Sequence, residues 1–386
     1  MGYSIFSFFS GSGFLDLGFE MSGFSIDLVN EYSRVFIHAY QYSRQGMGMA
    51  EPKYGYQNID VNEYLTVRTD ELRGYIKAER EAGNLVGFIG GPPCPDFSVA
   101  GKQRGREGVN GRLSLSYIRL IIDQHPDFFL FENVKGLWRT AKHRAFYEEM
   151  KLMLADAGYR MSNRLTNSIE FGAPQDRDRI LLFGISRESF PHLAIFSFPW
   201  KRHVLYDWKH IKNLHWPTTE AFAEDSEREC PTDIPRELTV QYWFDKNDVT
   251  HHPNAGDCFV PRQGLRKMLV VEEGDVSKKS HKRLHRWRYS PTVAYGNNEV
   301  HLHPYHARRL TVAEAPSLMT RYVIVAPDDD REKVVEEANR QQFLSLDTRY
   351  FAYSSVEELY YLCTHRGLHG VSQEFIDNYM EKVRIS

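Results

Sequence analysis

The stretch that decides the fold is Ser4-Ile5-Phe6-Ser7-Phe8-Phe9-Ser10-Gly11-Ser12-Gly13, close to the N-terminus. An apolar run that stops at a turn of serines and glycines predicts a buried strand over 4–9. The residues that follow predict a helix over 15–21 and a second strand, Ser25–Asn30, which ends at Glu31. A strand, a helix and a strand in this order form a βαβ unit, so the chain begins as a parallel α/β fold.

The same alternation continues to about residue 189. Further helices are predicted over 34–42, 70–82, 113–124 and 144–157, and further strands over 86–89, 128–131 and 179–185. From about residue 190 to 288 the periodicity weakens and Pro, Trp and His become frequent. We therefore predict a sheet domain over 1–189, an inserted irregular domain over 190–289, and a return to the sheet domain over 290–386 with an atypical tail. Two amphipathic helices are expected in that tail, over 331–341 and 372–383.

The composition excludes several classes of protein. With 386 residues, 42% hydrophobic and 26% charged, the chain has the make-up of a soluble globular protein. Its length suggests two domains, because single cores stop growing beyond about 250–300 residues. Neither a membrane span nor a signal peptide is apparent. The spacing of the four cysteines fits no disulfide framework and no zinc cluster, so we expect no metal and a reducing, cytoplasmic location. The net charge of −3 argues against a surface that is positive throughout, so nucleic-acid binding would depend on local basic patches.

The turn after the first strand suits a ligand. Glycines at Gly11 and Gly13 let the backbone approach a bound molecule closely, and the N-terminus of the next helix favours negative charge. Glu31, at the end of the second strand, can accept hydrogen bonds from ribose hydroxyls. Together these features indicate a nucleoside-containing cofactor, with a plain tight turn as the alternative.

A cysteine and an acid follow two later strands. Gly90-Gly91-Pro92-Pro93-Cys94-Pro95 is a stiff loop that presents a thiol at the sheet edge where ligands bind. A thiol of pKa ~8.5 is only partly ionised at neutral pH but is intrinsically nucleophilic. Glu132 could lie beside it and hydrogen-bond or protonate a substrate nitrogen. The alternatives are a buried structural cysteine and a capping or solvated acid.

Two segments are notably basic. Gln175–Arg179 brings Arg177 and Arg179 to one face of a strand, where paired guanidiniums suit a phosphate or a base edge. A structural ion-pair ladder is the alternative. Lys278–Arg288 contains six Lys or Arg and no acid, which favours a phosphate-contacting stripe over a merely solvated basic face.

Taken in this order, these segments resemble the cytosine-C5 DNA methyltransferase family. The resemblance covers residues 6–185 and resumes at 290–315. Its five motifs are the cofactor loop Phe9–Phe14, Pro93-Cys94, Glu132-Asn133-Val134, the QxRxR-like Gln175–Arg179, and the LTxxEA-like segment within Arg308–Ala315.

The resemblance implies a fold and a cofactor. The fold would be the class I methyltransferase α/β fold, a Rossmann-like, mostly parallel sheet flanked by helices, with an inserted, smaller and irregular target-recognition domain. The first domain would be catalytic and cofactor-binding. S-adenosylmethionine would be held by Phe9, Ser10, Gly11, Ser12, Gly13, Phe14, Leu15, Glu31, Asn58, Ile59, Asp60 and Pro92, with Glu31 on the ribose and Asn58 or Asp60 near the adenine.

The resemblance also implies a mechanism. The Cys94 thiolate would add to C6 of cytosine while Glu132 holds or protonates N3, so that C5 becomes nucleophilic and takes the methyl group. Loss of the C5 proton would then expel Cys94. Arg179 would contact the cytosine O2 and Arg177 would brace the catalytic loop. Because the ring is hidden in a duplex, the family flips its base out of the stack.

Double-stranded DNA would be the partner, bound by a basic loop that could close over the base and by the later stripe: Lys102, Arg104, Arg106, Lys278, Lys279, Lys282 and Arg283. We expect a monomer with no membrane association, cytoplasmic and nucleoid-associated if prokaryotic, beside a cognate restriction endonuclease.

The chain departs from the family pattern at three places. Phe14 stands where a further glycine is usual, and Asp96 replaces the commoner Gln. After Ala315 the usual continuation is replaced and the Gly-Asn-x-Val segment that helps wall the cofactor pocket is missing, so residues 316–386 are unassigned. Three alternatives stay open: a tRNA cytosine-C5 methyltransferase, a variant that uses a modified S-adenosylmethionine, and a catalytically impaired DNA-binding or regulatory homologue.

Overall fold

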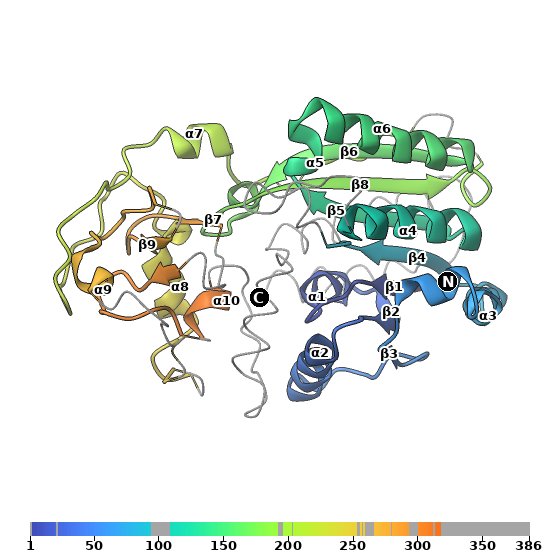
Figure 1. Cartoon of the computed structure of the whole chain (residues 1–386), viewed down its shortest axis with the longest axis horizontal. Coiled ribbons are helices and arrows are strands. Elements are labelled where there is room, and N and C mark those ends of the chain that lie inside the picture. The colour runs from blue at the N-terminus through green and yellow to red at the C-terminus, as the bar shows by residue number, and fades with distance from the viewer. Residues whose placement is uncertain are drawn as a thin grey trace, which may run out of the picture.

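In the computed structural model, the described residues are 2–20, 22–93, 109–191, 196–202, 204–252, 255–256, 258, 266–278, 280–292, 300–311 and 313–317. They form two lobes, one built on a large sheet and one largely irregular (Figure 1). Cys94, the basic loop that follows it, and both helices expected in the tail lie outside these residues.

The larger lobe is built on a seven-stranded sheet of order β3-β2-β1-β4-β5-β8-β6 (Figure 1). Neighbouring strands from β3 to β5 pair in parallel, whereas β8 pairs antiparallel with both β5 and β6. The mostly parallel α/β fold is therefore confirmed. The strands are β1 Tyr3–Phe8, β2 Ser25–Asn30, β3 Tyr56–Gln57, β4 Leu85–Gly90, β5 Phe128–Val134, β6 Tyr159–Asn167 and β8 Asp178–Ser186.

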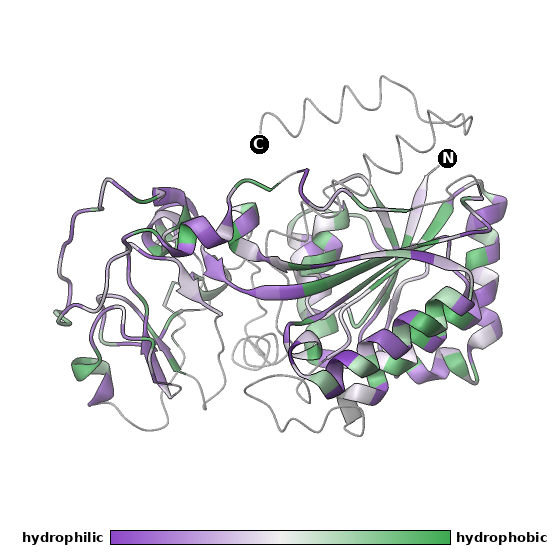
Figure 2. Cartoon of the chain, turned by 90° about the horizontal axis from the view of Figure 1, so that it is seen from above, coloured by the Kyte–Doolittle hydropathy of each residue, from purple (hydrophilic) through white to green (hydrophobic). Residues whose placement is uncertain are grey.

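Helices cover both faces of this sheet. The helices α3 (Thr69–Glu81), α4 (Val109–Gln124) and α6 (Ala141–Asp156) form one core with alternate strand residues such as Phe88 and Phe129. The helices α1 (Phe14–Glu20) and α2 (Arg34–Gly46) share the other core with residues such as Leu130 and Phe183. Figure 2 shows the apolar sheet between helices whose outer surfaces are polar. Shorter elements are η1 Val61–Leu65, α5 Gly136–Arg139 and η3 Ser168–Phe171.

The sequence missed one strand of this lobe. β6 runs for nine residues, Tyr159–Asn167, but only its ends are buried. Its polar sequence lacks the apolar run that marks the other strands, because it lies at the edge of the sheet and is held mainly by antiparallel pairing with β8. β6 and β8 extend past the other strands towards the second lobe (Figure 1).

The second lobe is assembled from short elements, namely β7 Gln175–Asp176, α7 Trp208–Lys212, η4 Arg236–Leu238, α8 Val240–Lys246, α9 Lys267–Val270, β9 His281–Arg283, β10 Ser290–Pro291, β11 Val300–Leu302 and α10 Glu314–Ser317. β10 pairs with β7 and β11 pairs with β9. We expected a return to the sheet domain from residue 290. Because β11 pairs with β9 and α10 contacts α8, the described residues from Val300 to Ser317 instead stay in the second lobe.

In the part of the chain that the structure describes, no helix has the length and apolarity to cross a bilayer.

Candidate active site

The expected site segments meet at one edge of the sheet. The chain moves outward from β1 to β3 and returns to β4 on the other side of β1, which makes this the switch point where ligands bind in such folds. Phe8 pairs with Gly90, and Gly90 with Phe131, so the loops that follow β1, β4 and β5 lie side by side. β8 runs the other way, and its early residue Arg179 pairs with Val134 at the same edge.

The glycine loop after β1 is tightly folded. Ser10 donates its backbone N–H to Asn30 at 3.2 Å, and Gly13 donates to Ser10 at 2.9 Å. Gly13 has φ of +84°, and a Cβ there would lie 2.4 Å from the ring of Tyr40. Only glycine fits at this position, both sterically and conformationally. Phe14 and Leu15 then open α1 and are buried.

Glu31 anchors this loop. Its carboxylate accepts the N–H of Gly11 at 2.9 Å and the N–H of Ser33 at 2.7 Å, and the residue is 2% exposed. The carboxylate follows β2 directly, at the place where an acid suits the ribose hydroxyls of a nucleoside. The side chain of Asn58 donates to the backbone carbonyls of Glu31 and Tyr32, each at 2.8 Å. Asn58 thus shapes the backbone beside the expected pocket, while Asp60 caps the following 3-10 helix, and Ile59 lies half-buried between them.

Sequence reasoning overlooked Tyr32. Its side chain is 76% exposed, directly after Glu31 and on a backbone held by Asn58. A bare aromatic ring next to a carboxylate that suits ribose is well placed to stack on a purine. The available signal was an aromatic residue immediately after the acid that ends the second strand.

Glu132 and Arg179 form a buried pair at the same edge. Glu132 Oε1 lies 2.7 Å from Arg179 Nε, and the side chains are 9% and 4% exposed. A Cβ on Gly91 would lie 2.8 Å from Glu132 Oε2, so this carboxylate touches the loop that runs through Pro92 and Pro93 to Cys94. Pro92 is itself buried. The acid and its arginine are therefore held against the loop that carries the expected nucleophile.

Buried polar atoms near this edge lack a hydrogen-bond partner within the described ranges. They include Ser12 Oγ, in the glycine loop, Asn133 Nδ2, next to Glu132, and Arg179 Nη2. Desolvated groups of this kind cost free energy unless a ligand or water pairs with them. Their position is therefore consistent with a site that binds polar molecules.

Arg177 lies differently from the expectation. It falls between β7 and β8, so Arg177 and Arg179 do not alternate along one continuous strand. It is 1% exposed, and its Nη1 lies 3.5 Å from Gln175 Oε1. Such deep burial fits the expected bracing role better than contact with a phosphate.

A buried charged group packs behind the glycine loop. Arg44 of α2 donates to the Gly13 carbonyl at 2.7 Å and pairs with Glu20 of α1 at 2.8 Å. Tyr40 donates to Asp16 at 2.9 Å. Burial raises the pKa of Asp16 to about 6 and that of Glu20 to about 7, although Arg44 acts in the opposite direction on both.

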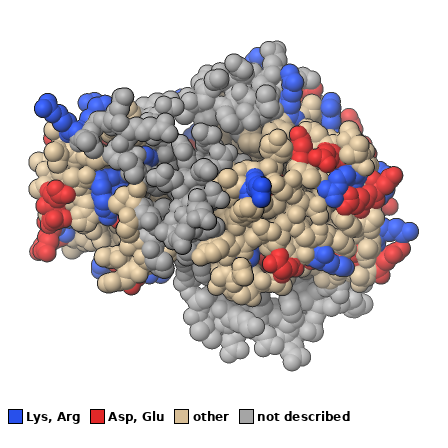
Figure 3. Space-filling model, turned by 60° about the horizontal axis from the view of Figure 1, so that its bottom comes forward, with Lys and Arg blue, Asp and Glu red and all other residues tan. Residues whose placement is uncertain are grey.

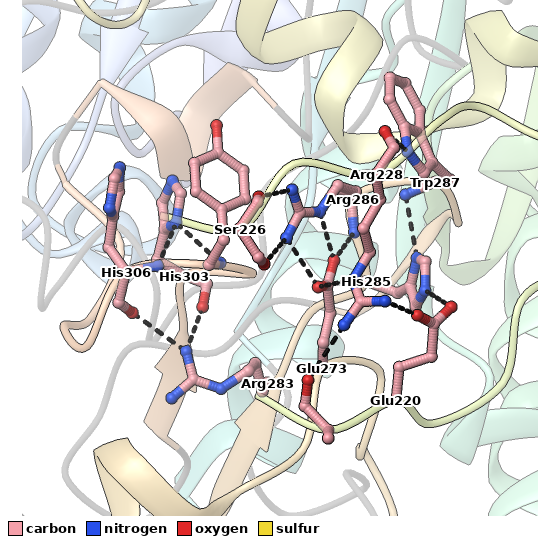
Figure 4. Close-up of polar contacts among 12 residues, drawn as sticks. Glu220, Ser226, Arg228, Glu273, Arg283, His285, Arg286, Trp287, His303 and His306 are labelled. Carbon is pink, nitrogen blue, oxygen red and sulfur yellow. Dashed lines mark hydrogen bonds and ion pairs between the residues drawn. The ribbon is translucent and has the colours of Figure 1, made fainter. Parts of the chain in front are cut away.

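The expected basic stripe is only partly at the surface. Arg283 is fully buried and donates to the backbone carbonyls of Met268 and Val271. It also donates to the carbonyls of His303 and His306 (Figure 4). The prediction that Arg283 contacts a phosphate is therefore wrong, because its donors are used inside the lobe. Lys278 is exposed and Lys282 half-buried, while Lys279, Lys102, Arg104 and Arg106 lie outside the described residues.

Arg286, in the same segment, is structural too. Arg286 donates to both carboxylate oxygens of Glu273, at 2.8 and 2.9 Å, and Arg228 donates to Glu273 at 3.1 Å (Figure 4). Burial acts to raise the pKa of Glu273, but the bonds from Arg286 outweigh it and lower that pKa below its usual value. On the face seen in Figure 3, acidic and basic side chains are interspersed over the sheet lobe.

Within the described ranges, no group of three or more His, Cys, Asp or Glu side chains is arranged to hold a metal ion.

Comparisons with known proteins match most of the chain. The family model described as C-5 cytosine-specific DNA methylase matches residues 3–321. A second model, described as the C-terminal domain of the Type II restriction enzyme NmeDI, matches residues 308–383.

Individual relatives agree with the first match. The Type II methyltransferase M.NmeDI of Neisseria meningitidis serogroup C is 53% identical over 317 residues, which are 82% of this chain and 74% of that protein. M.FnuDI of Fusobacterium nucleatum is 28% identical over 92% of this chain and 88% of its own. The solved structure of S. pombe Dnmt2 methyltransferase has a TM-score of 0.55 over 92% of this chain and 98% of its own. Its sequence is 13% identical, so this similarity shows the fold alone.

Proposed function

The chain belongs to the C-5 cytosine-specific DNA methylase family, and we propose that it methylates C5 of a flipped-out cytosine in a specific duplex sequence with S-adenosylmethionine as donor. It is a DNA cytosine-5-methyltransferase of the restriction-modification type. The observation that carries the proposal is the Glu132–Arg179 pair, held at 2.7 Å against the loop that leads to Cys94.

The residues around the glycine loop and the end of β2 fit the cofactor. Glu31 keeps its carboxylate at the end of β2 with acceptor positions suited to ribose hydroxyls, and Tyr32 offers a ring for the adenine. Ser12 Oγ, without a partner in the part of the chain that the structure describes, can bond a polar group of the ligand. When bound there, S-adenosylmethionine supplies the activated methyl group.

The residues near the Glu132–Arg179 pair fit the cytosine ring. The Cys94 thiolate forms a bond to C6, and Glu132 hydrogen-bonds or protonates N3, so the electron pair displaced from the 5,6 double bond becomes available at C5. After C5 has taken the methyl group, a base removes the C5 proton, the double bond re-forms, and the C6–S bond breaks. Arg179 orients Glu132 and can donate to the cytosine O2, while Arg177 braces the loop from inside.

The DNA-binding surface is proposed at Lys278 and Lys282 of the second lobe, with Lys279 and the basic residues Lys102, Arg104 and Arg106 beyond the described ranges. Such cations would bind phosphates and position the duplex while the target base leaves the stack. We also propose that the protein acts in the cytoplasm, as a monomer, beside an endonuclease that cuts the same site.

The C-terminal part of the chain favours a second candidate, a DNA-binding homologue with impaired catalysis. Residues 308–383 match the C-terminal domain of a restriction enzyme, and the alignment with M.NmeDI leaves about a quarter of that relative uncovered. If a restriction-enzyme segment stands where the methylase family keeps part of its cofactor pocket, the chain would bind DNA but hold S-adenosylmethionine weakly.

Transfer of label from tritiated S-adenosylmethionine distinguishes the methyltransferase from the catalytically impaired DNA-binding homologue. Incubation with duplex DNA should label the DNA, and Cys94→Ala should abolish the label. Label in tRNA alone would overturn the DNA substrate, and a folded protein that shows no cofactor binding at millimolar concentration would favour the second candidate. Mass spectrometry of the product nucleosides would detect any transferred group other than methyl.

The covalent step has its own test. Duplex DNA with 5-fluorocytosine at the target cannot lose a C5 proton, so the wild-type enzyme should remain attached through Cys94. Methyl transfer by Cys94→Ala, with no adduct trapped by 5-fluorocytosine, would contradict the covalent mechanism.

A further inference from the structure

Three buried residues and the partly buried Glu20 form a polar cluster between the first two helices. Asp16 and Glu20 come from α1, and Tyr40 and Arg44 come from α2. We name these four residues the Arg44 cluster. None of them has a part in the methyl-transfer steps, and burying two carboxyls and a guanidinium in one lobe costs free energy that apolar residues would not.

The side chain of Arg44 makes one hydrogen bond outside the cluster among the described residues, and that bond is to the glycine loop. Its Nη2 donates to the carbonyl of Gly13 at 2.7 Å and pairs with Glu20 at 2.8 Å, and its side chain is 2% exposed. The guanidinium carbon lies 4.4 Å from the centre of the Tyr40 ring, within the range of a cation–π contact. Arg44 is therefore held by α1 and α2 and bonded to the loop.

Tyr40 and Asp16 connect the cluster to the first strand. The Tyr40 hydroxyl donates to Asp16 Oδ2 at 2.9 Å, and Ser7 of β1 donates to Asp16 Oδ1 at 2.8 Å. The same Tyr40 ring fills the space beside Gly13, where a Cβ would lie 2.4 Å from it. The cluster thus contacts the loop by a hydrogen bond and by close packing.

The side chains of Glu31 and Arg44 both bond the loop. Glu31 accepts the N–H of Gly11 at 2.9 Å, and Arg44 binds the carbonyl of Gly13. Because the C=O and N–H of a trans peptide point in opposite directions, fixing the Gly13 carbonyl also fixes the N–H of Phe14. A loop ordered before the ligand arrives loses less conformational entropy on binding.

We infer that Arg44 is a positioning residue for the nucleoside cofactor, which acts by holding the glycine loop through the Gly13 carbonyl, with Glu20, Tyr40 and Asp16 orienting it. Because this role rests on the proposed function, it concerns the affinity for the cofactor and leaves the chemistry at Cys94 and Glu132 unchanged.

The titration of the cluster gives an independent signature. Burial raises the pKa of Glu20 to about 7, so this carboxyl gains a proton as the pH falls through neutrality and its pairing with Arg44 weakens. The other titratable groups that face Glu20 and Arg44 are Asp16, Tyr40, and Tyr56 of β3 with its neighbour Glu51. We expect the loop to be held less firmly at pH 6 than at pH 8.

Calorimetric titration of the full chain with S-adenosylhomocysteine, in the absence of DNA, tests this role. Arg44→Met should raise Kd at least tenfold. Arg44→Lys should raise it less, because lysine keeps the charge but loses the fork. Arg119→Met, at an exposed arginine of α4, should leave Kd unchanged and serves as the control. In kinetics, Arg44→Lys should raise KM for the cofactor and leave kcat nearly unchanged.

The pH arm uses Glu20→Gln. The wild type should bind more weakly at pH 6 than at pH 8, and Glu20→Gln should flatten that difference. Suppose that the wild type binds S-adenosylhomocysteine, that folded Arg44→Lys keeps the wild-type Kd, and that Glu20→Gln keeps the wild-type pH profile. That result would overturn the positioning role of Arg44 and leave the proposed function standing. Absence of binding by the wild type would overturn the proposed function and this role with it.

Discussion

Replacing Gly13 by alanine adds one methyl group where the structure has no room for it. Its φ is +84°, and a Cβ would lie 2.4 and 2.6 Å from two ring carbons of Tyr40 and 3.0 Å from Arg44 Nη2. A non-glycine residue in the left-handed region costs about 1–2 kcal/mol, and overpacking by a methyl group costs about 1–3 kcal/mol. We therefore expect Gly13→Ala to lower the free energy of unfolding by about 2–5 kcal/mol.

Gly83 provides a matched control. It has φ of +83° and nothing within 4 Å of its would-be Cβ, so Gly83→Ala should incur only the backbone cost of about 1–2 kcal/mol. Urea unfolding followed by circular dichroism gives both losses, and titration with S-adenosylhomocysteine should show weaker binding in Gly13→Ala alone. Equal losses of stability in the two variants would refute the close packing of Tyr40 and Arg44 against the loop.

The remaining predictions concern three other parts of the molecule. Glu132→Gln should lower the methyl-transfer rate by about 10²–10⁴-fold, because the amide cannot act as an acid. Arg283→Met should destabilise the second lobe in urea without changing the salt dependence of DNA affinity, whereas Lys278→Ala should reduce that slope by about 0.9. Tyr32→Ala should raise Kd for S-adenosylhomocysteine with an unchanged Tm, since the ring is 76% exposed.

Each of these has a contrary result. Wild-type transfer by Glu132→Gln would exclude proton donation from that residue. A smaller salt slope in Arg283→Met would mean that its guanidinium reaches DNA despite its burial, and an unchanged Kd in Tyr32→Ala would separate the aromatic ring from the cofactor pocket.

Much of the sheet lobe could be predicted from the sequence. β1, β2, β4 and β5 are apolar runs that stop at turns or polar residues, and this pattern marks buried parallel strands directly. The same reasoning placed Glu31 and Glu132 at strand ends. The register then explains why both acids reach one edge, which local pattern alone does not reveal.

Burial of charged side chains could not be predicted in the same way. Lys278–Arg288 looks like a solvent-facing basic stripe, yet Arg283 and Arg286 are buried by contacts with residues far away in the chain. Arg44 likewise lies beyond the helix predicted over 34–42, and only the approach of α1 to α2 shows that it pairs with Glu20. β6 was missed because a polar edge strand depends on its partner β8.

Bisulfite sequencing of DNA from a host that expresses the chain tests its central activity most directly. We predict cytosines protected at one short sequence throughout the genome, and no protection when the host expresses Cys94→Ala. A host with abundant folded protein and no protected cytosines would contradict methylation of DNA at cytosine C5.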